Sequence, residues 1–437
     1  MFTTLKNAFK IKEIRKKLLY TLGMLFVIRL GSQLPVPGVD RTYFARWFAA
    51  QSGDSFNFFD AFTGGSFLNM SVFALNITPY ITSSIIMQLM TIAIPKLEEM
   101  QKEGEDGRKK IASITRYVTV GLALIESTAM AIGFGRSGLL EQFNALNVIT
   151  VITALTAGSA VLMWIGERIT ENGVGNGISI VLIINIISRI PQDMAGLYEQ
   201  FVKGKAIALA VLSAVVIIAI IVVMIVLVII LNDGERRIPV QYAKKVQGRR
   251  MVGGNSTHIP LKINTAGVIP IIFASSLMEF PVIICSLLNV SATGVGAEIL
   301  KGLSSSNWCR INTPKYSWGL VLYIVLVLFF AYFYTSITFN PTEIADNMKK
   351  SGGFIPGIRP GKPTSDYLSR ILNYIIFIGA CGLTIIGILP FVFNGLFNAS
   401  VSFGGTSLII IVSVILETIK QVESQMLVRN YKGFLND

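Results

Sequence analysis

Residues 206–231 read AIALAVLSAVVIIAIIVVMIVLVIIL, an apolar run without one charged side chain. A helix needs about 20 apolar residues to cross the hydrocarbon core of a bilayer, so this run is long enough to span it. Further apolar blocks lie at 18–34, 72–94, 111–133, 146–165, 177–190, 264–288, 317–337, 371–392 and 405–427. The block 177–190 is short, and Arg29 interrupts the first block. The pattern predicts an all-α integral membrane protein with about ten transmembrane helices.

The composition agrees with lipid as the solvent. Hydrophobic residues make up 52% of the 437 residues and charged residues 14%, whereas soluble proteins carry about 25% charged residues. Five blocks precede residues 191–205, which we predict to be an external hinge loop, and five follow. An odd number of spans in each half, 1–190 and 206–437, predicts that the halves are related by inversion, as in many transporters.

The basic residues indicate the orientation. Of the 38 lysines and arginines, 28 lie in the N-terminal segment, in alternate loops and in the C-terminal tail. Because basic residues accumulate on the cytoplasmic side, both termini are predicted to be cytoplasmic. No small-residue cleavage site follows the first block, so we interpret it as a retained helix rather than a signal peptide.

The long external segment 31–71 ends in DAFTGGSFLNMS, which is apolar but too short to span. Such a segment can re-enter the membrane only where protein or a water-filled cavity surrounds its backbone. It could equally be a surface loop with a few aromatic side chains. The residues alone leave both alternatives open.

Two long cytoplasmic loops, 232–263 and 338–370, have the composition of docking sites. The first carries the basic pairs Arg236–Arg237, Lys244–Lys245 and Arg249–Arg250, and its QYAKKV stretch alternates as a hairpin strand would. The second combines glycine and proline turns with apolar residues and Arg359. We expect both loops to dock a large, anionic partner.

The sequence argues against an enzyme. It holds no GxxxxGK[ST], no HExxH and no paired intramembrane aspartates, and its three cysteines lack metal-ligand spacing. We therefore predict no catalytic residue, no cofactor and no metal site, and we expect a partner to hydrolyse any ATP. A solute transporter would share the span count, but it needs a polar midplane site. The few intramembrane charges and the large docking loops favour a channel.

Five strings, in order, resemble the SecY family, the channel subunit of the bacterial Sec protein translocon. They are FTGGSFLNMSVFALNITPYITSSIIMQL (62–89), ITENGVGNGISI (169–180), QGRRMVGGNSTHIPLKIN with AGVIPIIFASS (247–276), FNPTEIADNMKKSGGFIPGIRPG (339–361) and FGGTSLIIIVSV (403–414). The resemblance covers essentially the whole chain. It implies two five-helix halves around an hourglass pore. Such a channel passes unfolded preproteins across the cytoplasmic membrane and releases membrane segments sideways into the lipid.

The resemblance also implies a gate. The family's apolar pore ring falls on Ile77, Ile81, Ile178, Leu182, Ile272 and Ile410. Its plug falls on Phe62, Thr63, Gly64, Gly65, Ser66, Phe67, Leu68, Asn69, Met70 and Ser71. Among these, Ser66 and Asn69 suit a hydrated funnel. An apolar constriction is physically suitable because it closes by dewetting while allowing any side chain to pass.

A lateral gate is expected between the spans beginning near 72 and 111 and those beginning near 264 and 316. Its candidate residues are Ile86, Gln88, Glu126, Asn264 and Ser275. A carboxyl group within a span is costly and usually faces protein or water, so Glu126 has either a gate role or a structural hydrogen bond.

The resemblance further implies Arg249, Arg250 and Arg359 as partner contacts. The implied partners are SecE and SecG-like membrane subunits, the SecA motor, the ribosome through its RNA, signal sequences of preproteins, and membrane lipid.

Overall fold

The computed structural model describes residues 8–40, 43–44, 63–136, 138, 140, 142–203, 207–242, 245–247, 250–252, 256–287, 294–310, 314–397 and 405–433. Each of the ten apolar blocks coincides with one long helix. These helices are α2 (Lys12–Gly31), α5 (Thr78–Ala93), α7 (Glu105–Arg136), α8 (Ala145–Asn172), α9 (Gly177–Phe201), α10 (Ile207–Asp233), α11 (Ile269–Leu287), α13 (Trp318–Thr338), α15 (Lys362–Phe397) and α16 (Gly405–Gly433). The all-α prediction is therefore confirmed.

Not every helix has the length and composition of a full span. Within the described residues, six helices are long and apolar enough to cross a membrane, or seven if α5 and the following α6 (Pro95–Lys102) form one bent span. Ile94 adopts an extended conformation between them, and the axis turns by 106°. Because Pro95 lacks an N–H and restricts the residue before it, the helix breaks there.

One boundary prediction is wrong, and a second predicted loop has structure of its own. Residues 191–201 are not loop, because α9 continues through Pro191 to Phe201. The loop 338–370 is largely structured, since it contains α14 (Pro341–Lys350), β5 (Gly353–Phe354) and the first turns of α15. Asn340 caps α14 by accepting hydrogen bonds from the backbone N–H groups of Thr342 and Glu343.

The other long loop, 232–263, contains a β-hairpin. Strand β1 (Glu235–Tyr242) pairs antiparallel with β4 (Ser256–Lys262), and Ile238 lies opposite Ile259. Strand β5 adds to the other edge of β1, and the short strands β2 (Lys245–Gln247) and β3 (Arg250–Val252) form a second pair. Of the predicted QYAKKV strand, Gln241 and Tyr242 lie in β1 and Lys245 and Val246 lie in β2, while 243–244 lie outside the described residues.

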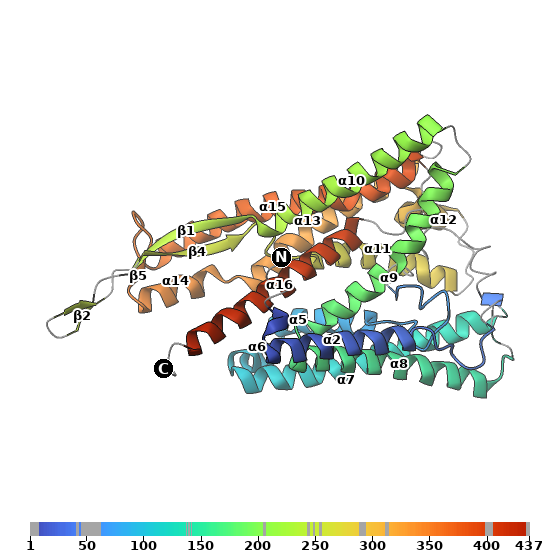
Figure 1. Cartoon of the computed structure of the whole chain (residues 1–437), viewed down its shortest axis with the longest axis horizontal. Helices are drawn as coiled ribbons and strands as arrows, with labels where there is room; N and C mark the ends of the chain where they lie inside the picture. Colours follow the sequence, from blue (N-terminus) through green and yellow to red (C-terminus); the bar gives the residue numbers. More distant parts are fainter. Residues whose placement is uncertain are drawn as a thin grey trace.

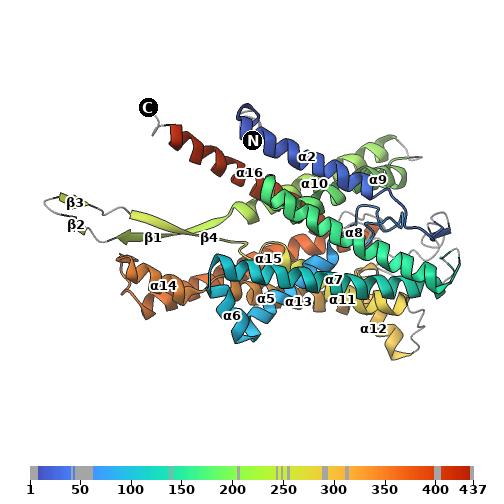
Figure 2. The ribbon, with the colours of Figure 1, turned by 90° about the horizontal axis from the view of Figure 1, so that it is seen from below.

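The long helices run along the long axis of the molecule (Figure 1). Figure 2 shows that α6, the β1–β4 hairpin and α14 lie at one end, while α12 (Val295–Leu303) lies at the other. Two 3₁₀ turns, η1 (Ser305–Asn307) and η2 (Pro314–Ser317), follow α12. The loops that the charge pattern assigned to one side are thus together on one side.

The helices pack in two groups, α2 with α5–α9 and α10–α11 with α13–α16. The groups meet where α9 packs against α10 and α16, and again where α7 packs against α11. Apolar clusters lie within each group and also at the α9–α16 junction. The cluster at the α9–α16 junction contains residues of both groups.

Candidate functional site: an apolar constriction, a buried loop and a helix seam

All six predicted ring residues lie in one apolar cluster. They come from four helices: Ile77 and Ile81 from the start of α5, Ile178 and Leu182 from α9, Ile272 from α11 and Ile410 from α16. Ile77 and Ile410 are almost fully buried, and Leu182 is 9% exposed. The fold therefore brings together side chains separated by more than 300 positions in sequence.

Local helix geometry explains how α9 presents its two residues. Asn176 caps the helix by accepting hydrogen bonds from the backbone N–H groups of Ile178 and Ser179. Ile178 and Leu182 are then four positions apart and share one face of the helix. Ile77 and Ile81 have the same spacing at the start of α5. Branched apolar side chains arranged in this way can close a passage without binding what passes through it.

The described part of the predicted plug, Thr63–Ser71, is enclosed by protein rather than being a surface loop. Phe67 is 4% exposed and packs edge-on against Phe44, with ring centroids 6.0 Å apart. Phe134 of α7 lies 5.1 Å from the Phe44 ring and extends the same cluster. The first plug residue, Phe62, lies outside the described residues. The loop is therefore seated among α7, α8 and the segment after α2.

Backbone hydrogen bonds hold the far end of this loop. Val36 N–H donates to the Met70 carbonyl, and Val72 N–H donates to the Leu34 carbonyl, both at 2.9 Å. The prediction that Ser66 lies in a hydrated funnel is wrong, because Ser66 is 2% exposed. Its hydroxyl-bearing turn is covered by the surrounding helices.

One pocket lies at the seam between α5 and the pair α11 and α13. It is lined by Ile85, Gln88, Leu89, Phe273, Phe330, Phe333 and Tyr334. The Phe273 and Phe330 rings stack with centroids 5.1 Å apart, joining α11 to α13. Gln88 is thus at the seam predicted for the lateral gate. The polar groups in this lining are Gln88 and the Tyr334 hydroxyl, and the rest is aromatic or aliphatic. Such a lining suits an apolar segment.

The remaining gate candidates are placed differently. Ile86 of α5 is half-buried and Ser275 of α11 is buried, and neither lines the seam pocket. Glu126 is half-buried on α7, the helix that contacts α11. Asn264 points into its own group, where its Nδ2 donates to Asn232 Oδ1 of α10 at 3.0 Å. Asn264 is therefore bound away from the seam.

A polar contact that the sequence did not predict fixes α5 to α7. The Ser83 hydroxyl lies 2.5 Å from the Thr119 hydroxyl and donates to the Thr115 carbonyl at 3.1 Å. Thr115 and Thr119 are four positions apart, so they share the face of α7 that meets α5. In the sequence, the four-residue spacing of Thr115 and Thr119 within a predicted span was the signal that could have located this contact. Small polar side chains of this kind join membrane helices.

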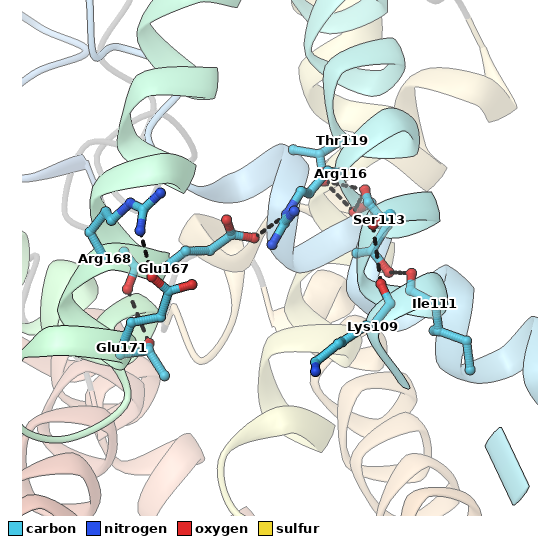
Figure 3. Close-up of polar contacts among 12 residues, drawn as sticks. Lys109, Ile111, Ser113, Arg116, Thr119, Glu167, Arg168 and Glu171 are labelled. Atoms are coloured by element: carbon cyan, nitrogen blue, oxygen red, sulfur yellow. Dashed lines mark hydrogen bonds and ion pairs between the residues drawn. The ribbon is translucent and has the colours of Figure 1, made fainter. Parts of the chain in front are cut away.

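A second unpredicted contact lies one turn away. Arg116 Nε of α7 donates to Glu167 Oε1 of α8 at 2.7 Å, and Arg168 forms an ion pair with Glu171 within α8 (Figure 3). Together with the Ser83 contact, the Arg116–Glu167 pair connects α5, α7 and α8. These three helices are therefore joined by direct polar contacts on one side of the seam.

The docking candidates lie on the structured loops. Arg359 is exposed in the turn before α15, and its backbone carbonyl accepts a hydrogen bond from the Thr364 hydroxyl at 2.8 Å. Arg250 begins β3 at the far end of the hairpin, and Arg249 lies outside the described residues. Figure 1 shows the hairpin projecting beyond the helices, so this end of the molecule is accessible to a large partner.

Comparison with known proteins agrees with the resemblance found in the sequence. Residues 71–419 match the family model for SecY. The chain is 44% identical to the protein translocase subunit SecY of Streptomyces scabiei, over 100% of both chains. Two solved structures share the fold at lower identity. One concerns the plug domain of SecY and a membrane seal, with TM-score 0.61, 18% identity and coverage of 94% and 92%. The other is Sec61 in a canine ribosome–channel complex, with TM-score 0.59, 16% identity and the same coverage.

Proposed function

The chain belongs to the SecY family and is a multi-pass membrane protein that conducts protein, and we propose that the residues described above form its gate. In this proposal Ile77, Ile81, Ile178, Leu182, Ile272 and Ile410 form a dewetted ring. The single observation that carries it is that all six, although they come from four helices, lie in one apolar cluster. Water enters such a constriction reluctantly, so the closed channel holds back ions.

Residues 62–71 act as the plug in this proposal. The enclosure of Thr63–Ser71 by protein supports it, because an irregular backbone is stable at membrane depth only where protein or water surrounds it. Its anchorage at both ends leaves a short glycine-containing segment that can move without unfolding a helix. A structural relative in which the plug stabilises the closed state supports the same role.

The seam between α5 and the pair α11 and α13 is the proposed lateral gate. Its apolar pocket matches the chemistry of a signal sequence or a membrane segment. The two helix groups would separate here, while the connection that follows Phe201 at the end of α9 acts as the hinge. Gln88 lines this gate, and Glu126, Ile86 and Ser275 lie on its helices.

We further propose that both termini are cytoplasmic, in the cytoplasmic membrane of a bacterium. The excess of basic residues on the side bearing the β1–β4 hairpin supports this orientation. Arg249, Arg250 and Arg359 then face the ribosome and a SecA-type motor, which supplies the energy of ATP hydrolysis. Arginine suits such contacts through its fixed charge and planar donors. SecE and SecG-like subunits complete the membrane complex.

Reconstitution tests the function directly. The chain is placed in proteoliposomes with a SecE-type subunit, the motor, ATP and a preprotein, and protease-protected substrate is measured. We expect protection that depends on ATP and on an intact signal sequence. Equal protection in liposomes without the chain would contradict the proposal.

A further inference from the structure

One turn of α9 contacts both ends of the loop that leads from the plug to α5. Asn185 and Ser188 are three positions apart on α9, so they lie on the same side of the helix. Gly64, near the start of the loop, rests against both residues, and Asn76, at its end, is hydrogen-bonded to Asn185. The loop is therefore held at two points by a single short stretch of helix.

The contact at Gly64 requires glycine. Its φ is +65°, and a Cβ there would lie 2.5 Å from the Asn185 carbonyl oxygen. The Ser188 hydroxyl donates to the Asn185 carbonyl at 2.6 Å and also lies 3.3 Å from the Gly64 carbonyl, which accepts a hydrogen bond from Arg29 Nη1 at 3.4 Å. Arg29 is the cation that interrupts the first apolar block. The hydrogen bond to the Gly64 carbonyl gives this cation a polar partner within the helix bundle. A cation within a span is stable only with such a partner.

The contact at Asn76 is made by the side chain. Its Oδ1 accepts a hydrogen bond from Asn185 Nδ2 at 2.9 Å, and both residues are at least 97% buried. Asn76 has φ +53°, a conformation that asparagine tolerates better than most residues. Its carbonyl also accepts from the Ser159 hydroxyl of α8 at 3.2 Å. The end of the loop is thus tied to both α8 and α9.

The Asn76–Asn185 hydrogen bond also joins two ring helices. Asn76 immediately precedes Ile77 in the chain, and Asn185 follows Leu182 by three positions, almost one helical turn. Widening the constriction between α5 and α9 would therefore separate the two amide groups. The same movement would remove the support beneath Gly64. Ring and plug are mechanically connected through these two residues.

We infer that Asn185 is a positioning residue that keeps the plug and the α5–α9 part of the ring in the closed arrangement. The inference rests on the proposed plug and ring assignments. Within the described residues Asn185 Oδ1 is buried without a hydrogen-bond partner, whereas water would satisfy it in an opened pore. The hydrogen bond between Asn185 and Asn76 stabilises the closed state. The unpaired buried acceptor is unfavourable and partly offsets this stabilisation, so opening stays accessible.

The test measures how readily the plug is exposed. A cysteine replaces Asn69 in an otherwise cysteine-free chain, and its labelling by a membrane-impermeant maleimide is followed in right-side-out vesicles containing the assembled complex. We expect Asn185→Leu to raise the labelling rate about tenfold, since it removes the side-chain amide that donates to Asn76 Oδ1. Asn76→Gly should act similarly, because glycine accepts the positive φ but lacks the amide.

Ser127→Ala is the matched control. It removes a half-buried hydrogen bond of 2.9 Å to Thr156, which joins α7 to α8 in the same helix group and does not involve the plug. Its labelling rate should stay within about twofold of the parent, since the hydrogen bond that it loses is not made to the plug. The double variant Asn76→Gly/Asn185→Leu should label no faster than either single variant, because both remove one shared interaction.

Deletion of residues 63–71, with ion leak as the readout, separates this inference from the proposed function. Unchanged labelling in Asn185→Leu and Asn76→Gly would overturn the positioning role, even where the deletion leaks ions. Equal acceleration in Ser127→Ala would overturn it as well. A third outcome is faster labelling in the two asparagine variants together with no ion leak in the deletion variant. It would support the positioning role of Asn185 but overturn the assignment of residues 62–71 as the plug.

Discussion

The hydroxyl groups of Ser83 on α5 and Thr119 on α7 lie 2.5 Å apart in a fully buried contact. Ser83 also donates to the Thr115 carbonyl, so one small side chain bonds two successive turns of α7. With Arg116 and Glu167 joining α7 to α8, the α5 side of the seam is a single unit. Opening at the seam should therefore leave α5 attached to α7.

The first prediction concerns this attachment. Ser83→Ala removes the hydroxyl and should lower the stability of the detergent-solubilised complex by ~0.6 kcal/mol, the mean for hydrogen bonds between membrane helices, and by no more than ~1.7 kcal/mol. Thermal unfolding measures the loss. Ser113→Ala is the control, because the Ser113 hydroxyl is exposed and bonds only its own helix at Lys109. Equal destabilisation by both changes would show that the interhelical contact contributes nothing.

The second prediction concerns the seam. Ile85 of α5 and Phe273 of α11 line the same pocket, so they are better placed than Ile86 and Ser275 to report its closure. Cysteines at Ile85 and Phe273, joined by a short bifunctional reagent, should block export of a preprotein because the seam cannot open. Each single cysteine should export normally. Undiminished export by the crosslinked protein would exclude this seam as the lateral gate.

The third prediction concerns the ring. Ile272→Asn or Ile410→Asn should hydrate the constriction and loosen the closed state, since ~1.4 kcal/mol shifts an equilibrium tenfold. Preproteins with defective signal sequences should then be exported, because less binding energy is needed for opening. Ile218→Asn is the control, because Ile218 is 57% exposed on the lipid-facing surface of α10. Unchanged stringency in both ring variants at normal protein levels would contradict the ring assignment.

The fourth prediction concerns docking. Arg359→Glu should impair motor-driven export while leaving the protein inserted, because it reverses a charge on an exposed surface. Arg250→Glu should weaken ribosome binding. Lys301→Glu makes the same change on exposed α12 at the opposite end of the molecule and should export normally. Normal export and normal ribosome binding in both arginine variants would place docking elsewhere.

The fifth prediction concerns orientation. In a cysteine-free chain, a cysteine at Ser305 should react with an impermeant maleimide added to intact cells, and one at Ser256 should not. Ser305 lies beside α12, whereas Ser256 is exposed in the hairpin at the opposite end. The charge asymmetry places the hairpin inside. Labelling at Ser256 but not at Ser305 would show the opposite orientation. The docking assignments of Arg250 and Arg359 would then be wrong as well.

The sequence by itself determined the solvent and the elements. Blocks such as 206–231 contain no charge, so they require lipid and the hydrogen bonding of a helix. The order of the blocks and the placement of basic residues also determined which loops share a side. Helix ends were less well predicted, because the apolar block ends near 190 whereas α9 continues past Pro191 to Phe201. The family motifs located the ring residues, which periodicity could not distinguish from lipid-facing isoleucines.

Only the tertiary structure decided which groups meet. Nothing in the local sequence distinguishes Asn264, which bonds Asn232 within its own helix group, from Asn185, which bonds Asn76. Arg29 was visible as an interruption, but its partner is a carbonyl 35 positions away at Gly64. Such pairs depend on the rotation and depth of packed helices, and a rotation of one residue turns a side chain by about 100°. Apolar content fixes that a helix is buried in lipid, whereas small polar contacts fix which of its faces meets its neighbour.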